Sequence, residues 1–365
     1  LVSTETGLPV VDVYAALQIG TAYEEAYTDS QGAFLFPPSP GCQINGLSLF
    51  LDADADNGVT TFDLIKIQKH ILGISALDSP YKMIAADADK SGHISTFDLI
   101  RIRRVILGLD DFFDGNTSWR FVDASYDFPD PANPFLEDFP EAMDFDLLGA
   151  DLTVSFVGIK VGDVNDSASP NGLTAGAVVE ERNQDEPWPL RTSDLDLTAG
   201  QTYEVVIRAA DVAFTEGYQF GLRFDPAALT LLEVRPGDLP DLTQGNFGFF
   251  PEDGLVTTSW HQAGPGAAPD GETLLTVLVR AERSGSLSRW LTLDGEKTAP
   301  VAYDFNQQAL PVTFGFSAGP AAEASMALYQ NRPNPFVNAT VIPFGLPEAG
   351  RAQRSVDDVS GDRLL

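Results

Sequence analysis

The sequence predicts a multidomain, mainly β protein in which β-sandwich domains flank a small helical module of two loop–helix units. One observation is an internal repeat: an acidic loop followed by apolar residues at helical spacing occurs twice, beginning at Asp52 and at Asp87. A second is the series of short apolar runs between turn residues, in a chain with 25 Pro and 32 Gly. The third is length, because 365 residues exceed one ordinary domain.

Five segments are expected along the chain. They are an N-terminally incomplete β segment at 1–48, the loop–helix module at 49–110, an irregular extension at 111–170 that closes with a strand and a turn, a β-sandwich at 174–316, and a linker with a truncated C-terminal domain at 317–365. The sandwich is predicted from runs typical of strands, at Tyr203 to Ala209, Tyr218 to Phe224, Leu229 to Val234, Leu255 to Trp260 and Leu274 to Ala281.

The N-terminal segment alternates apolar and polar side chains around two turns, at 28–32 and 37–41. Its two apolar runs predict strands of a small β-sandwich, or of part of one: Val10, Val11, Val13, Ala15 and Leu17, then Ala33, Phe34 and Phe36. Cys42 is the one cysteine, so no intrachain disulfide can form. We expect a small buried apolar residue there, with a reactive thiol as the alternative.

Both loops place oxygen atoms where a calcium-binding EF-hand loop needs them. Such a loop takes ligands from positions one, three, five, seven, nine and twelve, and needs a residue that tolerates positive φ at position six. An acidic surface turn that binds nothing is the alternative, and the gapless duplication argues against it. The expected ligands are Asp52, Asp54, Asp56, Gly58, Thr60 and Asp63, then Asp87, Asp89, Ser91, His93, Ser95 and Asp98, with Asn57 and Gly92 at the two turns and backbone carbonyls serving at Gly58 and His93.

A helix is predicted directly after each loop. The apolar residues have helical spacing: Leu64, Ile65, Ile67, Ile71 and Leu72, then Leu99, Ile100, Ile102, Ile106 and Leu107. Gly73 and Gly108 are expected to end the two helices, and basic residues in the later turns suit the helix dipole. No helix is expected before the first loop, where the stretch CQINGLSLFL is typical of extended chain.

A loop followed by one helix, given twice, resembles the type I dockerin family over residues 49–110. The resemblance implies about two calcium ions per chain, bound by the side chains of Asp52, Asp54, Asp56, Asp63, Asp87, Asp89, Ser91 and Asp98. It also implies that a cohesin domain, in this or another chain, is recognised through positions ten and eleven, which are Thr61, Phe62, Thr96 and Phe97. Cellulosomal dockerins usually have small hydroxyl residues at both positions. We therefore expect the two Phe side chains to pack on the neighbouring copy or the extension, with partner contact as the alternative.

Three other stretches carry resemblances. TETGLPVVDVYAAL with TDSQGAFLFP, in residues 1–48, resembles the prealbumin-like, carboxypeptidase-regulatory domain, which is usually a structural spacer. FDPAALTLLEV, in residues 174–316, is similar to the cohesin or carbohydrate-binding-like sandwich, which implies that one chain holds both halves of an adhesion pair. LYQNRPNPF, in residues 317–365, resembles the C-terminal sorting domain of type IX secretion, known from Bacteroidetes. That likeness implies export to the outer-membrane surface or the medium.

Charge and missing motifs exclude several classes of function. The chain has 53 acidic and 22 basic residues, a net charge of −31, so it lacks the clustered basic side chains that nucleic-acid phosphates require. This balance favours divalent cations and basic partners, although solubility in a salty medium explains it equally well. No apolar run of about 20 residues predicts membrane insertion. No Walker loop, zincin helix or nucleophile elbow is present, and we expect no enzyme activity.

Two functions fit these segments. The first is a non-catalytic, calcium-binding, extracellular or cell-surface scaffold or adhesion protein that uses dockerin–cohesin contacts. The second is the C-terminal accessory region of a secreted polysaccharide-degrading enzyme or protease, in which the sandwich binds carbohydrate.

Overall fold

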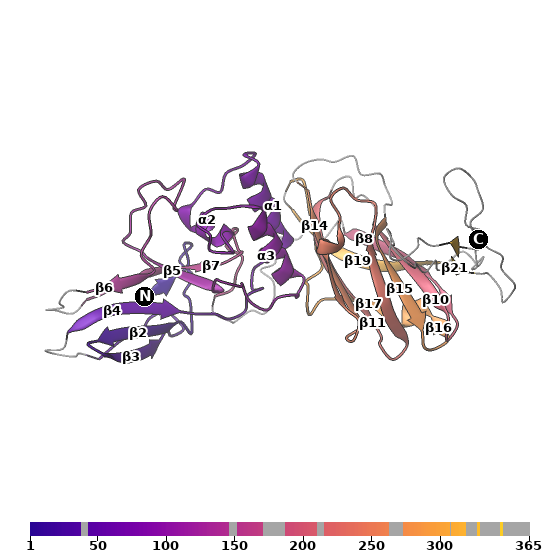
Figure 1. Ribbon diagram of the computed structural model, residues 1–365, viewed down its shortest axis with the longest axis horizontal. Coiled ribbons are helices and arrows are strands. Elements are labelled where there is room, and N and C mark those ends of the chain that lie inside the picture. Colours follow the sequence, from indigo (N-terminus) through magenta and orange to yellow (C-terminus); the bar gives the residue numbers. More distant parts are fainter. Residues whose placement is uncertain are drawn as a thin grey trace, which may run out of the picture.

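The computed structural model describes residues 1–37, 43–145, 152–170, 187–209, 215–262, 273–306 and 308–318, together with 327–328 and 344–345. Cys42 and most of the sorting-domain stretch lie outside the described residues. The described parts follow one another along the long axis: N-terminal sheets, then helices, then a sandwich (Figure 1). Among them, no helix is long and apolar enough to cross a lipid bilayer.

The N-terminal segment forms its sheets together with the extension. Strands β2 (Tyr14–Ile19), β3 (Ala22–Tyr27) and β4 (Ile44–Phe50) share a sheet with β6 (Ala142–Asp144), in the order β3-β2-β4-β6. In the second sheet, β7 (Phe156–Lys160) lies between β1 (Val2–Ser3) and β5 (Trp119–Asp123).

Two expectations for this region are corrected. The stretch with Ala33, Phe34 and Phe36 is not a strand, although both Phe side chains pack on the core, and the second strand is Ala22–Tyr27 instead. The extension is not irregular throughout, because it supplies β5, β6 and β7. Its closing strand was expected. Segments 1–48 and 111–170 thus share one apolar core, which includes Val2, Val10, Trp119, Phe121 and Phe156.

The loop–helix module has a helix after each loop, as predicted. These are α1 (Thr61–Ile71) and α3 (Thr96–Ile106), and each begins with a capping box in which the Asp at position twelve bonds back to the cap. Gly73 and Gly108 follow the helix ends at φ 68°, as expected of glycine in that position. A short helix not predicted, α2 (Pro80–Ala86), precedes the second loop and is capped by Ser79.

The sandwich spans residues 187–318. Its strands are β8 (Trp188–Asp194), β9 (Asp196–Leu197), β10 (Thr202–Ala209), β11 (Thr215–Phe224), β12 (Leu229–Pro236), β13 (Phe247–Phe250), β14 (Leu255–His261), β15 (Thr273–Ala281), β16 (Gly285–Ser286), β17 (Leu291–Asp294), β18 (Val301–Asp304) and β19 (Ala309–Ala318). All five predicted runs are strands.

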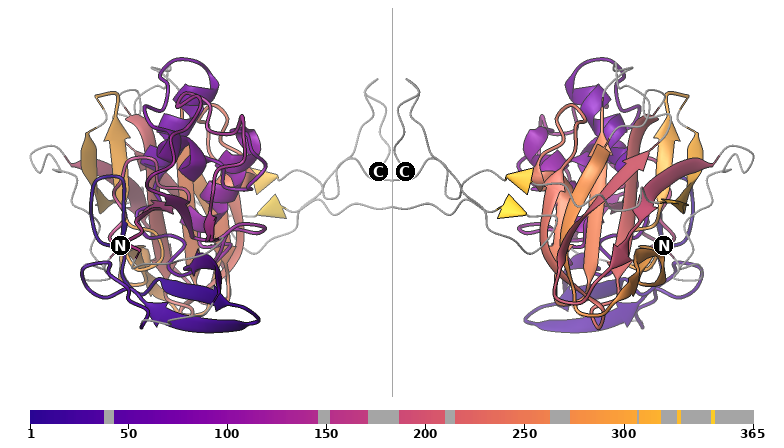
Figure 2. Two further views of the ribbon diagram at one scale, coloured as in Figure 1. Left: turned by 90° about the vertical axis from the view of Figure 1, so that its left-hand side faces the viewer. Right: turned by 90° about the vertical axis from the view of Figure 1, so that its right-hand side faces the viewer.

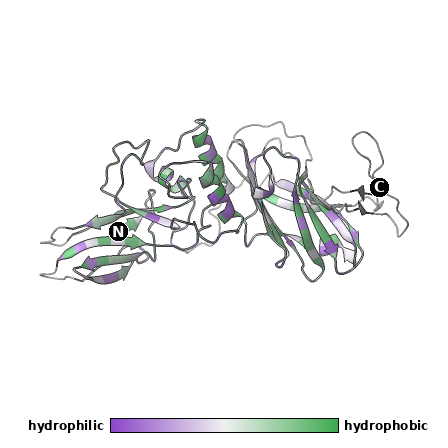
Figure 3. Ribbon diagram, viewed as in Figure 1, coloured by the Kyte–Doolittle hydropathy of each residue, from purple (hydrophilic) through white to green (hydrophobic). Residues whose placement is uncertain are grey.

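The two faces of the sandwich join through one strand. Along the sheet the order is β12-β15-β10-β8-β19-β18-β11-β14-β13, with β17 beside β11. Strand β19 pairs in parallel with β8 and antiparallel with β18, so it links the faces. Apolar residues line the strands (Figure 3), and the stacked rings of Trp188, Tyr218 and Trp260 fill part of the core between the faces.

Helix α1 packs on one face of the sandwich. Seen along the long axis, the helices lie in front of the strands of the sandwich (Figure 2). The helix contacts β11 and β14, and Ile65 and Phe62 share an apolar cluster with Val301, Tyr303 and Ala309. The module and the sandwich therefore meet within one chain.

Candidate functional site

The second loop brings three of its expected ligands together. Carboxylate oxygens of Asp87, Asp89 and Asp98 lie within 4.8 Å of one another, the only such group among the described residues. Backbone amides hold them: Asp87 accepts from Ser91 N and Gly92 N, both at 2.9 Å, and Asp98 accepts from Ser95 N at 2.7 Å. Gly92 lies at φ 80°, as position six requires.

The remaining expected residues of this loop also suit an oxygen-coordinated cation. Ser91 Oγ donates to the His93 carbonyl at 3.2 Å, which places these two expected ligands side by side. The His93 side chain is exposed, which leaves its carbonyl as the group that faces the loop. Burial, and then repulsion from Asp89 and Asp87, raise the pKa of Asp98. A divalent cation would remove this repulsion, so the residues present fit calcium.

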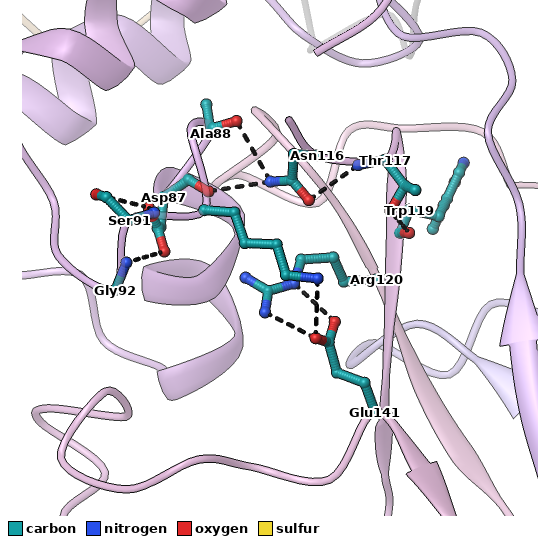
Figure 4. A network of polar contacts seen from close by, with 10 residues as sticks. Asp87, Ala88, Ser91, Gly92, Asn116, Thr117, Trp119, Arg120 and Glu141 are labelled. Atoms are coloured by element: carbon teal, nitrogen blue, oxygen red, sulfur yellow. Dashed lines mark hydrogen bonds and ion pairs between the residues drawn. The ribbon is translucent and has the colours of Figure 1, made fainter. Parts of the chain in front are cut away.

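The second loop is anchored to strand β5 and its flanks (Figure 4). Asn116 Nδ2 donates to the carbonyls of Asp87 and Ala88 at 3.2 and 3.3 Å. Arg120, which is buried, bonds to Glu141 at 2.8 Å, and Lys90 reaches the same carboxylate at 3.1 Å. Residues outside the second loop therefore hold its backbone in place, while the carboxylates of Asp87, Asp89 and Asp98 stay directed toward one another.

The first loop has a different geometry. Asp52 turns away and accepts from Ser118 N and Oγ at 2.9 and 2.7 Å. Asp63 is fully buried, and its oxygens accept from Thr60 N and Val164 N. Asp54 and Asp56 are exposed and join no cluster among the described residues. Four carboxylates that align in sequence with the second loop are therefore not brought together.

The turn of the first loop is also shifted. Positive φ occurs at Gly58, 75°, and not at Asn57, which we expected there. Asn57 instead exchanges side-chain bonds with Ser169 N and O, both at 3.0 Å. The Gly58 carbonyl, an expected ligand, accepts from Ser167 Oγ at 2.8 Å. Residues 163–169 thus bond to the turn residue Asn57 and to two expected ligands, the Gly58 carbonyl and Asp63.

Lys160 and Asp163 lie at the first loop and were not identified from the sequence. Both are buried, at 5% exposure each. Burial lowers the pKa of Lys160 to about 8, so its ammonium stays charged at neutral pH. Burial raises the pKa of Asp163 to about 6, although three backbone amides donate to it. Lys160 and Asp163 follow the first loop by about a hundred residues in the sequence, so no local sequence pattern identifies them as its neighbours.

Position ten of the first loop makes the central polar contact with the sandwich. Thr61 N, an amide that α1 leaves unpaired at its start, donates to Gln219 Oε1 at 2.7 Å. Thr61 Oγ1 lies 2.7 Å from Ser259 Oγ. Thr61 and Ser259 are fully buried. The sandwich therefore completes the hydrogen bonding of the helix N-terminus.

Position eleven makes the adjacent apolar contact. The Phe62 ring stacks on Tyr303 at 5.2 Å between centroids. We expected this side chain on the neighbouring copy or the extension, and it lies on the sandwich instead. Ile65 is fully buried beside Gly217, where an added Cβ would come within 3.0 Å of Ile65 Cδ1 and Thr61 Cγ2. Glycine at 217 thus permits the close approach of helix and strand.

A buried ion pair closes the contact further along α1. Lys69 Nζ lies 2.6 Å from Glu216 Oε1, with side-chain exposures of 12% and 1%. A carboxylate this deeply buried needs a cation beside it, because desolvation strongly disfavours an isolated charge. The pair therefore links the module specifically to β11.

The end of α3 also bonds to the sandwich. Its last carbonyls, at Ile106 and Leu107, accept from Thr298 Oγ1 at 3.0 Å and Thr257 Oγ1 at 2.8 Å. These carbonyls have no partner inside the helix. Arg103 Nη2 lies 3.3 Å from His261 Nδ1, so this histidine of the sandwich has a cationic neighbour on α3.

The same recognition positions in the second copy are free of the sandwich. Thr96 is exposed, and Phe97 and Ile100 have 67% and 49% of their surface exposed. We expected Phe97 to pack on the neighbouring copy or the extension, and its exposure shows that it does not. Equivalent residues of the two copies thus have opposite environments, although both copies read TFDLI.

Acid should weaken the structure around His261. Burial, and then the charge of Arg103, lower its pKa to about 3, against 6.5 for the exposed group. The unfolded chain therefore binds the proton first, and stability is full above pH 6.5 and falls as pH drops toward 3. Between pH 7.5 and 5 the loss should be about 2 kcal/mol. Urea unfolding of wild type and His261→Gln at both pH values checks it. Other titrating groups, such as Asp163, cancel in the comparison, and parallel losses in the two proteins would refute this role.

Comparisons with known proteins give similarities over about a third of the chain. No protein-family model matches it, and no curated protein is detectably similar in sequence. A type I cohesin–dockerin complex from Clostridium thermocellum, Coh-OlpC with Doc435, is 17% identical at a TM-score of 0.31 and covers 37% of this chain and 92% of its own. A non-cellulosomal cohesin from Archaeoglobus fulgidus is 18% identical at 0.27 and covers 35% and 86%.

Proposed function

We propose that this chain is a non-catalytic scaffold or adhesion protein in which a dockerin-like module docks on the cohesin-like sandwich of the same chain. One observation supports this most strongly: Thr61 and Phe62, at the recognition positions of the first loop, both contact the sandwich. The charged and polar pairs around them, Lys69–Glu216 and Arg103–His261, have the specificity of a protein interface.

Cutting the chain between residues 170 and 187 tests this function. A protease site inserted there lets the folded, full-length protein be cleaved into a module piece and a sandwich piece. The two should stay together on a sizing column at micromolar concentration. Pieces that separate without any substitution would refute the docking.

We further propose that the second loop binds calcium and that the protein acts outside the cell. The convergent carboxylates of Asp87, Asp89 and Asp98 support the first point. The net charge of −31 and the likeness of LYQNRPNPF to a sorting domain support the second. Calcium would then stabilise an exported module, in place of the disulfides that a single cysteine cannot supply.

Asp89→Asn should abolish calcium binding at the second loop. The side chain is half-buried and its loss removes one of three converging charges, while Ser91 N keeps its bond to Asp87. Calorimetric titration of wild type should give a dissociation constant of roughly 10⁻⁴–10⁻³ M, the range of extracellular modules. Asp78→Asn, an exposed carboxylate in the pair with Lys82, is the matched control and should bind as wild type does. Equal affinity of wild type and Asp89→Asn would exclude the site.

A further inference from the structure

A lysine side chain lies against the first loop and bonds to its backbone. Lys160, the last residue of β7, is 5% exposed. Its Nζ donates to the carbonyl of Ala55 at 2.7 Å and to that of Val161 at 3.1 Å. Ala55 is position four of the first loop. The ammonium is thus bound to the loop backbone itself.

The charges around this ammonium are those that a bound cation would meet. Lys160 interacts electrostatically with Asp163, Asp56, Asp63 and Asp54, and the last three belong to the loop. A buried ammonium is stable only when anions and hydrogen-bond acceptors surround it. The loop supplies both, and Lys160 in turn offsets part of the loop's negative charge.

Three of the expected ligand residues of the first loop instead make hydrogen bonds to other protein groups. Asp52 bonds to Ser118, Asp63 bonds to Thr60 and Val164, and the Gly58 carbonyl accepts from Ser167. An added Cβ at Gly58 would lie 2.4 Å from Ala168 N, so the segment 163–169 packs directly on the turn. A calcium ion needs six to eight oxygen ligands at about 2.3–2.6 Å, and these oxygens do not converge. The first loop therefore does not fit the ion that its sequence implies.

We propose that the Lys160 ammonium serves as the built-in cation of the first loop, so that only the second loop takes a divalent ion. The first loop begins α1, and α1 makes the contact with the sandwich through Thr61, Phe62 and Lys69. The α1 contact with the sandwich is consequently independent of calcium, although the end of α3 also bonds to the sandwich. Calcium acts on the other half of the module, where Phe97 and Ile100 are exposed.

Counting bound ions by native mass spectrometry of the full chain in calcium tests this proposal. Three proteins are compared: wild type, Asp89→Asn, and the double variant Asp54→Asn with Asp56→Asn, whose side chains are exposed and tolerate replacement. We expect one ion in wild type, none in Asp89→Asn and one in the double variant. Two ions in wild type, falling to one in the double variant, would overturn the proposal. No ion in wild type would refute the calcium site of the second loop and leave the lysine-filled first loop standing, so the two failures are distinguishable.

Hydrogen exchange of the same full chain gives a second readout. On chelation of calcium, amides of α1 should keep their protection within about twofold, whereas amides of residues 87–98 should exchange about tenfold faster or more. Loss of protection in α1 together with the second loop would overturn the calcium independence of the α1 contact. This readout does not require any variant to fold.

Discussion

Lys69→Ala should weaken docking of the module on the sandwich by about 3–5 kcal/mol, at least roughly 150-fold, because it leaves a buried carboxylate without its cation. The Glu216 side chain is 1% exposed, and among the described residues its carboxylate pairs with Lys69 Nζ alone. In the undocked sandwich the Glu216 carboxylate would be hydrated again. The substitution therefore lowers the affinity of docking and not the stability of the free sandwich. The dissociation constant of the chain cut between 170 and 187 measures it.

The second copy supplies a matched control for this substitution. Arg104 occupies the position equivalent to Lys69 and pairs with Asp110 at 2.6 Å, but the two side chains are 45% and 25% exposed. Such surface pairs contribute about 1 kcal/mol or less, so Arg104→Ala should leave docking unchanged. Adding Glu216→Gln to Lys69→Ala should restore much of the lost affinity, since the unpaired charge is removed. Equal effects of the two alanine variants would show that the ion pair has no role in docking.

Ile65→Asp should separate the module from the sandwich. The side chain is fully buried in the cluster with Phe62 and Tyr303 and lies against Gly217. A carboxylate there loses the apolar contact and adds an unpaired buried charge, a combined cost of more than about 4 kcal/mol. The cut chain should then elute as two pieces.

Ile100→Asp is the control for this variant, because it changes the equivalent residue of the second copy. Ile100 is 49% exposed and does not contact the sandwich. The two pieces of the cut Ile100→Asp chain should co-elute, as those of wild type do. Separation in both variants would mean that the helices, and not the α1 contact, are damaged. Circular dichroism of the pieces distinguishes loss of helix from loss of docking.

The sequence predicted those helices and strands whose formation depends on residue spacing, caps and turn residues within the element itself. Both helices, their capping Asp residues, their glycine ends and five strands of the sandwich follow from spacing and turn residues. Strand β3 was missed because Ala22–Tyr27 lies at a sheet edge and its Glu residues do not alternate with apolar ones. Helix α2 was missed because its seven residues are fewer than the roughly 11–18 over which a helical period can be recognised.

The site depended on contacts that no local pattern contains. The two loops share six of their twelve residues, including the Asp residues at positions one, three and twelve, yet only the first is approached by Lys160 and the segment 163–169. Phe62 and Phe97 occupy identical local sequences, and only tertiary packing decides that the first contacts Tyr303 while the second is exposed. Gln219, Ser259 and Glu216 lie in an ordinary strand pattern, so nothing local marks them as an interface.

Direct cross-linking of the central contact tests the docking of the module on its own sandwich. Thr61 Oγ1 and Ser259 Oγ are 2.7 Å apart, so cysteines at these positions lie within reach of a disulfide. In a Cys42→Ser background, the pair Thr61→Cys with Ser259→Cys should oxidise to an intrachain disulfide in a monomer, identified by peptide mass spectrometry. Thr96→Cys with Ser259→Cys, which uses the equivalent exposed position of the second copy, should not. Failure of the first pair to cross-link, or cross-linking only between two chains, would contradict docking within one chain.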